Sequence, residues 1–169
     1  MPFLCQKHRS QIQHKHINAG SLWRDLMHMG AHAHQEKRFK DAIHLFGAAA
    51  EVANMTLEQA PTDSSGSASQ ESPVEQLVAA THNLSASLCA QQQALAAEQV
   101  LTQLHSQVMA LCLNSNAARA QRVDALASLE TTLFSLTSHL GYQGKVDALH
   151  SIIEETERVA EQAAQELFH

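Results

Sequence analysis

The sequence contains little of what an aromatic-rich or β-sheet domain requires. Aromatic residues make up 4% of the 169 residues, and there are only three prolines and six glycines. β-branched residues are sparse and scattered, which argues against a sheet. Ala, Leu and Gln dominate, and hydrophobic residues still reach 44%, which is enough for a core. The composition therefore predicts an all-α chain, the size of one domain or of a short helical array.

Cysteine is also scarce, and long hydrophobic runs are missing. Cys5, Cys89 and Cys112 are widely spaced and odd in number. They therefore indicate no disulfide framework but reduced thiols, as is usual in the cytoplasm. No run is long enough to span a membrane, and the first residues lack the apolar stretch of a signal peptide. We therefore expect a cytoplasmic protein that has no membrane partner.

Motifs of catalysis are missing as well. The sequence has no Gly-rich phosphate loop, no HExxH and no GxSxG. Cys5 precedes Lys7, His8 and Arg9, but no acid–base set or oxyanion donor accompanies this thiol. We therefore expect no enzymatic activity and no cofactor. An enzyme of unrecognised type on a helical bundle is a rival hypothesis, and it predicts a closed polar pocket with perturbed ionisable groups.

The formal net charge of −6 hides a division along the chain. Residues 1–40 carry seven Lys/Arg and two Asp/Glu, a net charge of +5, whereas the remainder carries −11. Opposite charges of this kind attract each other within one molecule or between two, so a homodimer is one expectation. The acidic body argues against nucleic acid as the main partner.

Apolar residues spaced three and four positions apart predict about six helices in three antiparallel pairs. Ser72, Pro73 and Glu75 form the sharpest helix start, a capping box with proline at the first helical position. Ser21 is the expected cap of the first helix. The predicted domains are a basic, His-rich arm at 1–20 and a helical body at 21–169, with a flexible Ser/Pro-rich linker at 59–72. The expected helices cover about 22–36, 39–58, 73–91, 94–113, 117–139 and 145–167.

The first pair, at about 21–56, resembles a tetratricopeptide repeat. Gly30 and Ala42 stand where the two helices of such a hairpin approach too closely for a larger side chain. Phe39 and Phe46 stand where aromatic rings fill the gaps between hairpins. The residues at matching spacings are Trp23, Leu26, Gly30, Phe39, Ala42, Phe46 and Ala49.

The second pair, at about 74–113, resembles the same family more weakly, and Ala94 stands where the turn aromatic is expected. Its matching residues are Leu84, Ser85, Leu88, Ala97 and Leu101. The third pair keeps only a glycine turn at Gly144 and the apolar spacing. The resemblance implies stacked antiparallel hairpins, a tetratricopeptide-like array. A plain helical bundle without an open groove remains the alternative.

In this family the first helix of each hairpin lines a concave groove that binds extended peptides. The resemblance thus implies a bacterial-type scaffold or adaptor whose partner is a peptide or protein chain. The basic arm is then either an occupant of the groove or a second binding element. The family's carboxylate clamp is matched only by Asn83, because Met27 and Ala31 stand where charge and amide are needed. The implied binding residues are Arg24, Met27, Ala31, His34, Gln35, Ala79, His82, Asn83, Ala86 and Cys89.

A metal-binding or metal-responsive helical protein is the alternative function. Cys5 and His8 have a C-x2-H spacing, and His28 and His32 stand at i, i+4 on one helix face. A structural zinc site needs four ligands, usually with a second pair at defined spacing, and the sequence offers no such pair. Solvated histidines on a helix surface explain the same pattern. The candidate donors are Cys5, His8, His14, His16, His28 and His32.

Overall fold

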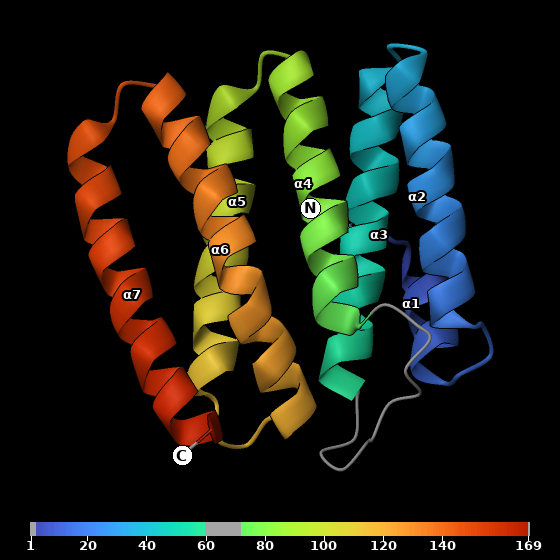
Figure 1. Ribbon diagram of the computed structural model, residues 1–169. Helices are drawn as coiled ribbons and strands as arrows, with labels where there is room; N and C mark the ends of the chain where they lie inside the picture. The colour runs from blue at the N-terminus through green and yellow to red at the C-terminus, as the bar shows by residue number, and fades with distance from the viewer. Residues whose placement is uncertain (1–2, 60–71, 169) are drawn as a thin grey trace.

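The computed structural model describes residues 3–59 and 72–168, which form seven α-helices and no strand (Figure 1). The all-α prediction is therefore confirmed for this part of the chain. One short helix, α1, precedes three antiparallel hairpins, α2–α3, α4–α5 and α6–α7. The helices are α1 (Gln6–Gln13), α2 (Ala19–Gln35), α3 (Phe39–Gln59), α4 (Pro73–Ala90), α5 (Ala94–Leu113), α6 (Arg119–Tyr142) and α7 (Val146–Phe168).

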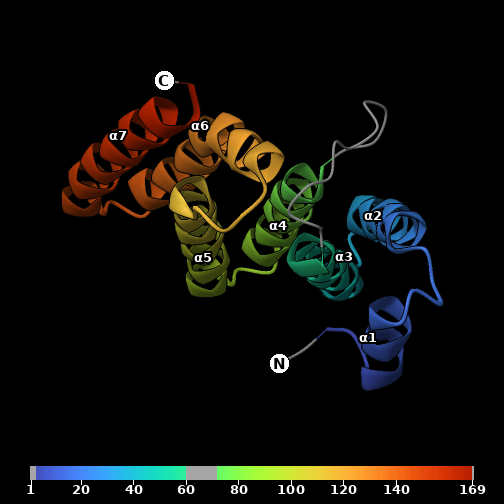
Figure 2. The same ribbon diagram turned by 90° about the horizontal axis from the view of Figure 1, so that it is seen from below.

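The helices zigzag between two layers. Seen along the helix axes, α2, α4 and α6 lie on one side, and α1, α3 and α5 lie on the other, with α7 beyond α6 (Figure 2). Each helix from α2 to α7 packs against the next, and further contacts join α2 to α4, α4 to α6 and α5 to α7. Each hairpin therefore buries its apolar face against its neighbour, as in a helical repeat.

Small residues set the spacing between the helices, and α3 is the most closely packed helix, between α2 and α4. A Cβ atom at Gly30 of α2 would lie 2.7 Å from the Cε1 atom of Phe46 on α3. This confirms the close approach that the sequence predicted at Gly30. The alanines without exposed surface are Ala33, Ala42, Ala49, Ala53, Ala80, Ala97, Ala125 and Ala163.

The observed N-cap residue agrees with the sequence prediction for α4 and differs from it for α2. The Ser72 hydroxyl accepts from the Glu75 N–H, and the Glu75 carboxylate accepts from the Ser72 N–H, which confirms the capping box. The cap of α2 is Asn18, whose Oδ1 accepts the N–H of Ser21, so the prediction of Ser21 as the cap was wrong. Asn caps as well as Ser does, and Ala19 and the following glycine are then helical.

The buried face of α6 is more polar than its leucine spacing predicts. Val123, Leu126 and Leu133 have the apolar spacing of a core face but are only half-buried. Arg122 is buried instead, because it donates to the Cys112 carbonyl at 2.9 Å and to the Glu166 carboxylate of α7 at 2.5 Å. Hydrogen bonds to α5 and α7, as well as hydrophobicity, therefore determine which residues of α6 are buried.

The predicted glycine turn at the end of α6 is present, whereas most of the predicted linker lies outside the described residues. Gly144 has a φ of 72°, the left-handed conformation expected where α6 ends. Gln59 still belongs to α3 and Ser72 caps α4, while residues 60–71 of the expected linker lie outside the described part of the chain. Among the described helices, none combines the length and hydropathy needed to cross a membrane.

The closest contact in the first hairpin generates a stability prediction. Phe46 is 1% exposed and packs against Gly30, so Phe46→Ala leaves a cavity that its close-packed neighbours cannot fill. We expect a loss of about 3–5 kcal/mol in the free energy of unfolding, measured by urea denaturation. The control is Phe134→Ala on α6, where the ring is 71% exposed and the expected change is within about 0.5 kcal/mol. Equal losses in the two variants would contradict the packing of Phe46 against Gly30.

Candidate partner-binding face

The ten residues that the resemblance assigned to a groove lie on α2 and α4, which are adjacent in one layer (Figure 2). The structure therefore brings the two predicted sets onto neighbouring helices. Six of these residues are exposed: Arg24, Ala31, Gln35, Asn83, Ala86 and Cys89. Four are half-buried: Met27, His34, Ala79 and His82.

His34 joins the two helices of this layer. Its Nδ1 lies 2.9 Å from the Ser87 hydroxyl of α4, and that hydroxyl donates its own proton to the Asn83 carbonyl. Ser87 therefore accepts the Nδ1–H of His34, which fixes the tautomer of the ring. The ring also meets Phe39 edge to face, with 5.1 Å between centroids. His34 thus holds α2 in register with α4.

His82 contributes a polar atom to the same layer. It is half-buried on α4, and its Nε2 is buried without a hydrogen-bond partner among the described residues. Burial lowers the pKa of His82, because desolvation disfavours the charged ring. The lowered pKa favours the neutral ring at pH 7.

The layer continues onto α6 through a contact between Cys89 and His139. The Nε2–H of His139 donates to the Ala94 carbonyl at 3.1 Å, so Nδ1 carries the lone pair. This Nδ1 lies 3.8 Å from the Cys89 sulfur. Although Cys89 is exposed, desolvation of its sulfur raises the pKa of the thiol, which favours the protonated thiol in this contact.

His139 was missed by the sequence interpretation, which assigned groove positions only to the first two hairpins. The available signal was the position of His139 on the first helix of the third hairpin. That hairpin resembles the family too weakly for positions to be carried over. The structure shows where His139 lies, because α6 packs beside α4 in the same layer.

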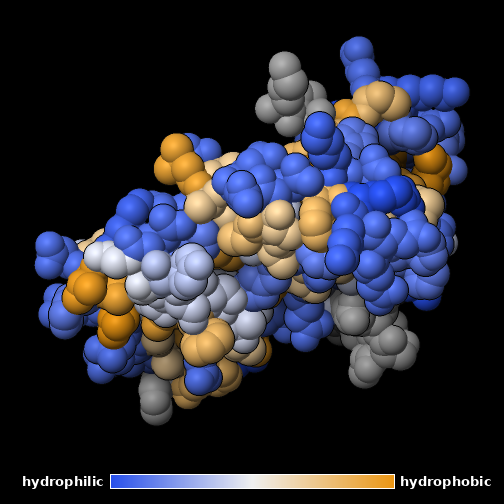
Figure 3. Space-filling view, turned by 90° about the horizontal axis from the view of Figure 1, so that it is seen from above, coloured by the Kyte–Doolittle hydropathy of each residue, from blue (hydrophilic) through white to orange (hydrophobic). Residues whose placement is uncertain are grey.

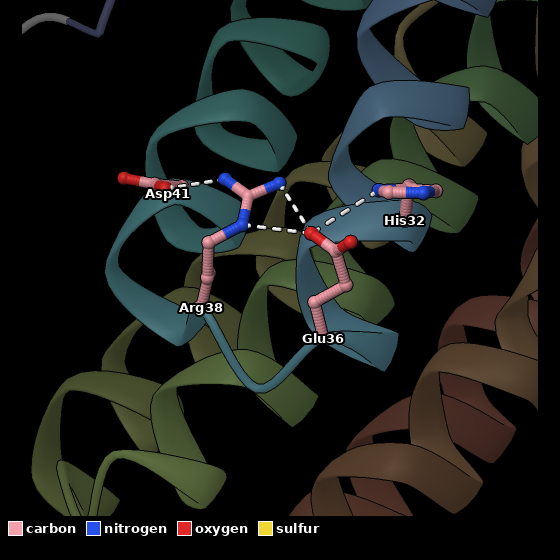
Figure 4. A network of polar contacts seen from close by, with 4 residues as sticks. All are labelled: His32, Glu36, Arg38 and Asp41. Atoms are coloured by element: carbon pink, nitrogen blue, oxygen red, sulfur yellow. Dashed lines mark hydrogen bonds and ion pairs between the residues drawn. The ribbon is translucent and has the colours of Figure 1, made fainter.

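The histidines of α2 lie at the turn end of the first hairpin. His32 Nδ1 is 3.4 Å from the Glu36 carboxylate, which also binds Arg38 at 2.8 Å (Figure 4). Arg38 donates to Asp41 as well, at 2.5 Å, and these two acids raise the pKa of the guanidinium. His32 thus belongs to a solvent-exposed network of polar contacts that ties the end of α2 to the start of α3.

The other candidate donors are spread over the N-terminal part of the fold. Cys5 caps α1, and its sulfur lies 3.3 Å from His8 Nδ1 on the same helix. His14 and His16 follow α1, and their rings are 6.0 Å apart. Within residues 3–59 and 72–168, no three His, Cys, Asp or Glu side chains are placed to share a metal ion.

A hydrophobic depression lies at the far end of the molecule. It has a volume of about 480 Å³ and is lined by Leu133, Phe134 and Thr137 of α6 and by Ile153 of α7. Hydrophobic atoms also reach the surface at the α6–α7 end of the mainly hydrophilic face that carries the hairpin turns (Figure 3). Val146 and Phe168 add exposed apolar surface to the same hairpin.

A buried histidine fastens the third hairpin to the second. His105 of α5 has its Nδ1 2.9 Å from the Thr132 hydroxyl of α6 and its Nε2 2.9 Å from the Thr156 hydroxyl of α7. Burial lowers the pKa of His105, and the negative charge of Glu155 offsets part of this effect. One side chain therefore holds three helices and fixes where α6 lies beside α4.

Comparison with known proteins gives one match. The family described as "Protein of unknown function (DUF2753)" matches residues 21–169. The chain belongs to the DUF2753 family. The match spans all three hairpins and begins two residues inside α2. No curated protein and no solved structure matches the chain.

The buried His105 makes the stability of this DUF2753 protein depend on pH. Its pKa lies below the ordinary 6.5 in the folded state, so the unfolded chain binds more protons as the pH falls below 6.5. We expect urea denaturation to show lower stability at pH 5.5 than at pH 7.5. His105→Gln should cost about 1–3 kcal/mol at pH 7.5 and reduce this pH dependence, because it removes the titrating group.

The control for that experiment is His28→Gln on the exposed surface of α2. We expect it to leave the difference between the two pH values unchanged. Part of the difference should survive in His105→Gln, because burial also lowers the pKa of His82. An unaltered pH dependence in His105→Gln would show that other groups cause it.

The three thiols should differ in reactivity. Cys112 has no exposed surface, and burial raises its pKa to about 11, so its thiol is protonated and inaccessible. Cys5 and Cys89 are exposed. We expect titration with an aromatic disulfide at pH 8 to detect these two thiols in the folded protein and Cys112 only after denaturation. Rapid reaction of Cys112 in the native protein would contradict the packing between α5 and α6.

Proposed function

We propose that this DUF2753 protein is a non-catalytic interaction module, a cytoplasmic scaffold or adaptor that binds a peptide or partner chain. The proposed binding surface is the face formed by α2, α4 and α6, which we call the α2–α4–α6 face. The resemblance of the first hairpin to a tetratricopeptide repeat supports this choice, since such repeats bind peptides along the corresponding helices. We propose a tetratricopeptide-like array for the same reason.

One observation carries the proposal. The contacts between His34 and Ser87 and between Cys89 and His139 link α2, α4 and α6 in series. Side chains from three hairpins therefore share one face and keep a fixed spacing along it. Rigid elements that present convergent side chains bind with little ordering entropy, which favours recognition of an extended chain.

The face is mixed in chemistry and carries few charges. Arg24 is a cation at one end, Asn83 is an exposed amide in the middle, and the raised pKa of Cys89 keeps its thiol protonated. Ala31 and Ala86 keep the surface low between these polar groups. Such a surface suits a peptide that is recognised mainly through its backbone and through small or polar side chains, because hydrogen bonds to the backbone need close approach.

Site-specific photocrosslinking in cells tests the proposal. A photoreactive amino acid replaces Ala31 or Ala86 on the proposed face, and it replaces the exposed Ala110 of α5 as the control. We expect Ala31 and Ala86 to give the same adduct and Ala110 to give none. Adding Asn83→Ala should reduce the adduct several-fold, since a lost hydrogen bond weakens binding by about 1 kcal/mol.

Two results would count against this function. Adducts of equal yield from Ala110 would place the contact on the opposite layer. If neither Ala31 nor Ala86 gave an adduct, no partner would bind at this face. The metal-binding alternative stays a prediction that no arrangement of the described residues favours, and titration with zinc of the chain and of a His28→Ala/His32→Ala variant tests it.

A further inference from the structure

The segment that precedes α2 is held by one carboxylate of α3. Glu51 accepts the backbone N–H of Phe3 at 2.6 Å and the backbone N–H of Leu4 at 2.9 Å, and Arg9 donates to it from Nη2 at 2.8 Å. The Glu51 side chain is 20% exposed, so these charge-assisted bonds are partly shielded from water. A carboxylate that binds two consecutive N–H groups recognises an extended backbone, which any peptide offers.

Beside Glu51 lies a seat for an aromatic ring. A Cβ atom at Gly47 would lie 2.5 Å from ring atoms of Phe3, so only glycine leaves room for the ring there. Gly47 stands in the interior of α3, where glycine is unfavourable for a helix. The ring of His44 approaches Phe3 from one turn earlier, with 6.1 Å between centroids. The sequence of α3 therefore accommodates an aromatic side chain at the expense of helix propensity.

The seat opens into a cleft between α3 and α5 that has α4 as its floor. The cleft has a volume of about 270 Å³, and Phe3 forms one of its walls. Leu77 and Leu84 of α4 and Val100 of α5 provide apolar lining. Asn54 and Gln107 form a polar rim and bridge the two helices through a hydrogen bond of 2.6 Å. The cleft offers a ligand more apolar and amide surface than the single ring of Phe3 covers.

The attachment of segment 3–13 is thin. Beyond Glu51 its main anchors are Leu4 and Ile12, the two buried residues of the segment. The Nε of Arg9 is buried without a hydrogen-bond partner among the described residues. A buried polar atom without a partner opposes docking, which makes the segment easier to displace from its seat.

The family match covers the seat but not the segment that occupies it. Gly47 and Glu51 lie within residues 21–169, which match the DUF2753 family, whereas segment 3–13 lies outside that match. The seat therefore lies in the part of the chain that the family model covers, and the segment precedes that part.

We propose that this seat is a second peptide-binding site, which segment 3–13 occupies as a displaceable internal ligand. The site lies in the layer opposite the α2–α4–α6 face and does not depend on that face. Its external ligand is an extended segment of another protein that carries an aromatic side chain for Gly47. A nearby Arg or Lys of that ligand takes the place of Arg9 at Glu51. Because the internal segment competes, the apparent affinity for the external ligand falls in proportion to the fraction of chains in which the seat is free.

Fluorescence anisotropy with a labelled synthetic peptide tests the proposal. The probe has the sequence of residues 1–16 with Cys5→Ser, and it is added to the full chain. We expect the Phe3→Ala chain to bind the probe roughly tenfold more tightly than the wild-type chain, because its own segment no longer fills the seat. A probe that carries Phe3→Ala should not bind detectably.

Two further variants locate the binding within the Phe3→Ala chain. Glu51→Gln removes the carboxylate charge, and Gly47→Ala fills the seat while favouring the helix, so each should weaken probe binding at least about tenfold. The matched control is Glu58→Gln, an exposed carboxylate on the same helix, which should leave binding unchanged. Circular dichroism checks that each variant keeps its helical content.

Specific results would overturn the proposal. One is a Phe3→Ala chain that does not bind the probe, and another is binding that is insensitive to both Glu51→Gln and Gly47→Ala. Light scattering distinguishes an external peptide from a second copy. A wild-type dimer that the probe dissociates would show that the segment of a second copy is the natural ligand, and the proposed external peptide would then be wrong.

Discussion

The structure depends on the close approach of α3 to both of its neighbours. None of the hairpins can bury its apolar face alone, so each helix must meet the next hairpin at short range. Gly30 lets the ring of Phe46 lie directly against the backbone of α2, and buried alanines continue the same spacing along α3. Close-packed seams of small residues leave little freedom in how the hairpins stack. The order of the two layers, and therefore the position of both candidate binding surfaces, follows from this spacing.

The two candidate surfaces differ in how they are built. The α2–α4–α6 face consists of side chains on three helices, and it exists only because polar contacts keep these helices in register. The seat at Gly47 and Glu51 lies on a single helix, and α4 and α5 only extend it into a cleft. One surface therefore requires the whole array, whereas the other requires α3 to be properly packed. A molecule of this size can carry both because the layers face in opposite directions (Figure 2).

The sequence predicted what depends on local spacing. The all-α class, the helix positions, the capping box of α4 and the close approach at Gly30 all follow from residues a few positions apart. The buried face of α6 could not be predicted in this way, because Arg122 and Thr132 are buried by partners on other helices. The docking of the arm also could not be predicted from local spacing, because Glu51 is 42 residues from Arg9 in the sequence. The one local signal was Gly47, since a glycine inside a helical pattern often has a packing reason.

The ring of His105 contacts two threonine hydroxyls, and each of these hydroxyls also has a carbonyl partner on its own helix. The hydroxyls of Thr132 and Thr156 each lie within hydrogen-bond distance of a carbonyl of their own helix and of the ring. A neutral imidazole has only one N–H, and it satisfies only one of them. The other threonine must turn its proton to the ring and release its own carbonyl. The ring tautomer therefore decides whether Thr132 of α6 or Thr156 of α7 keeps the hydrogen bond to a carbonyl of its own helix.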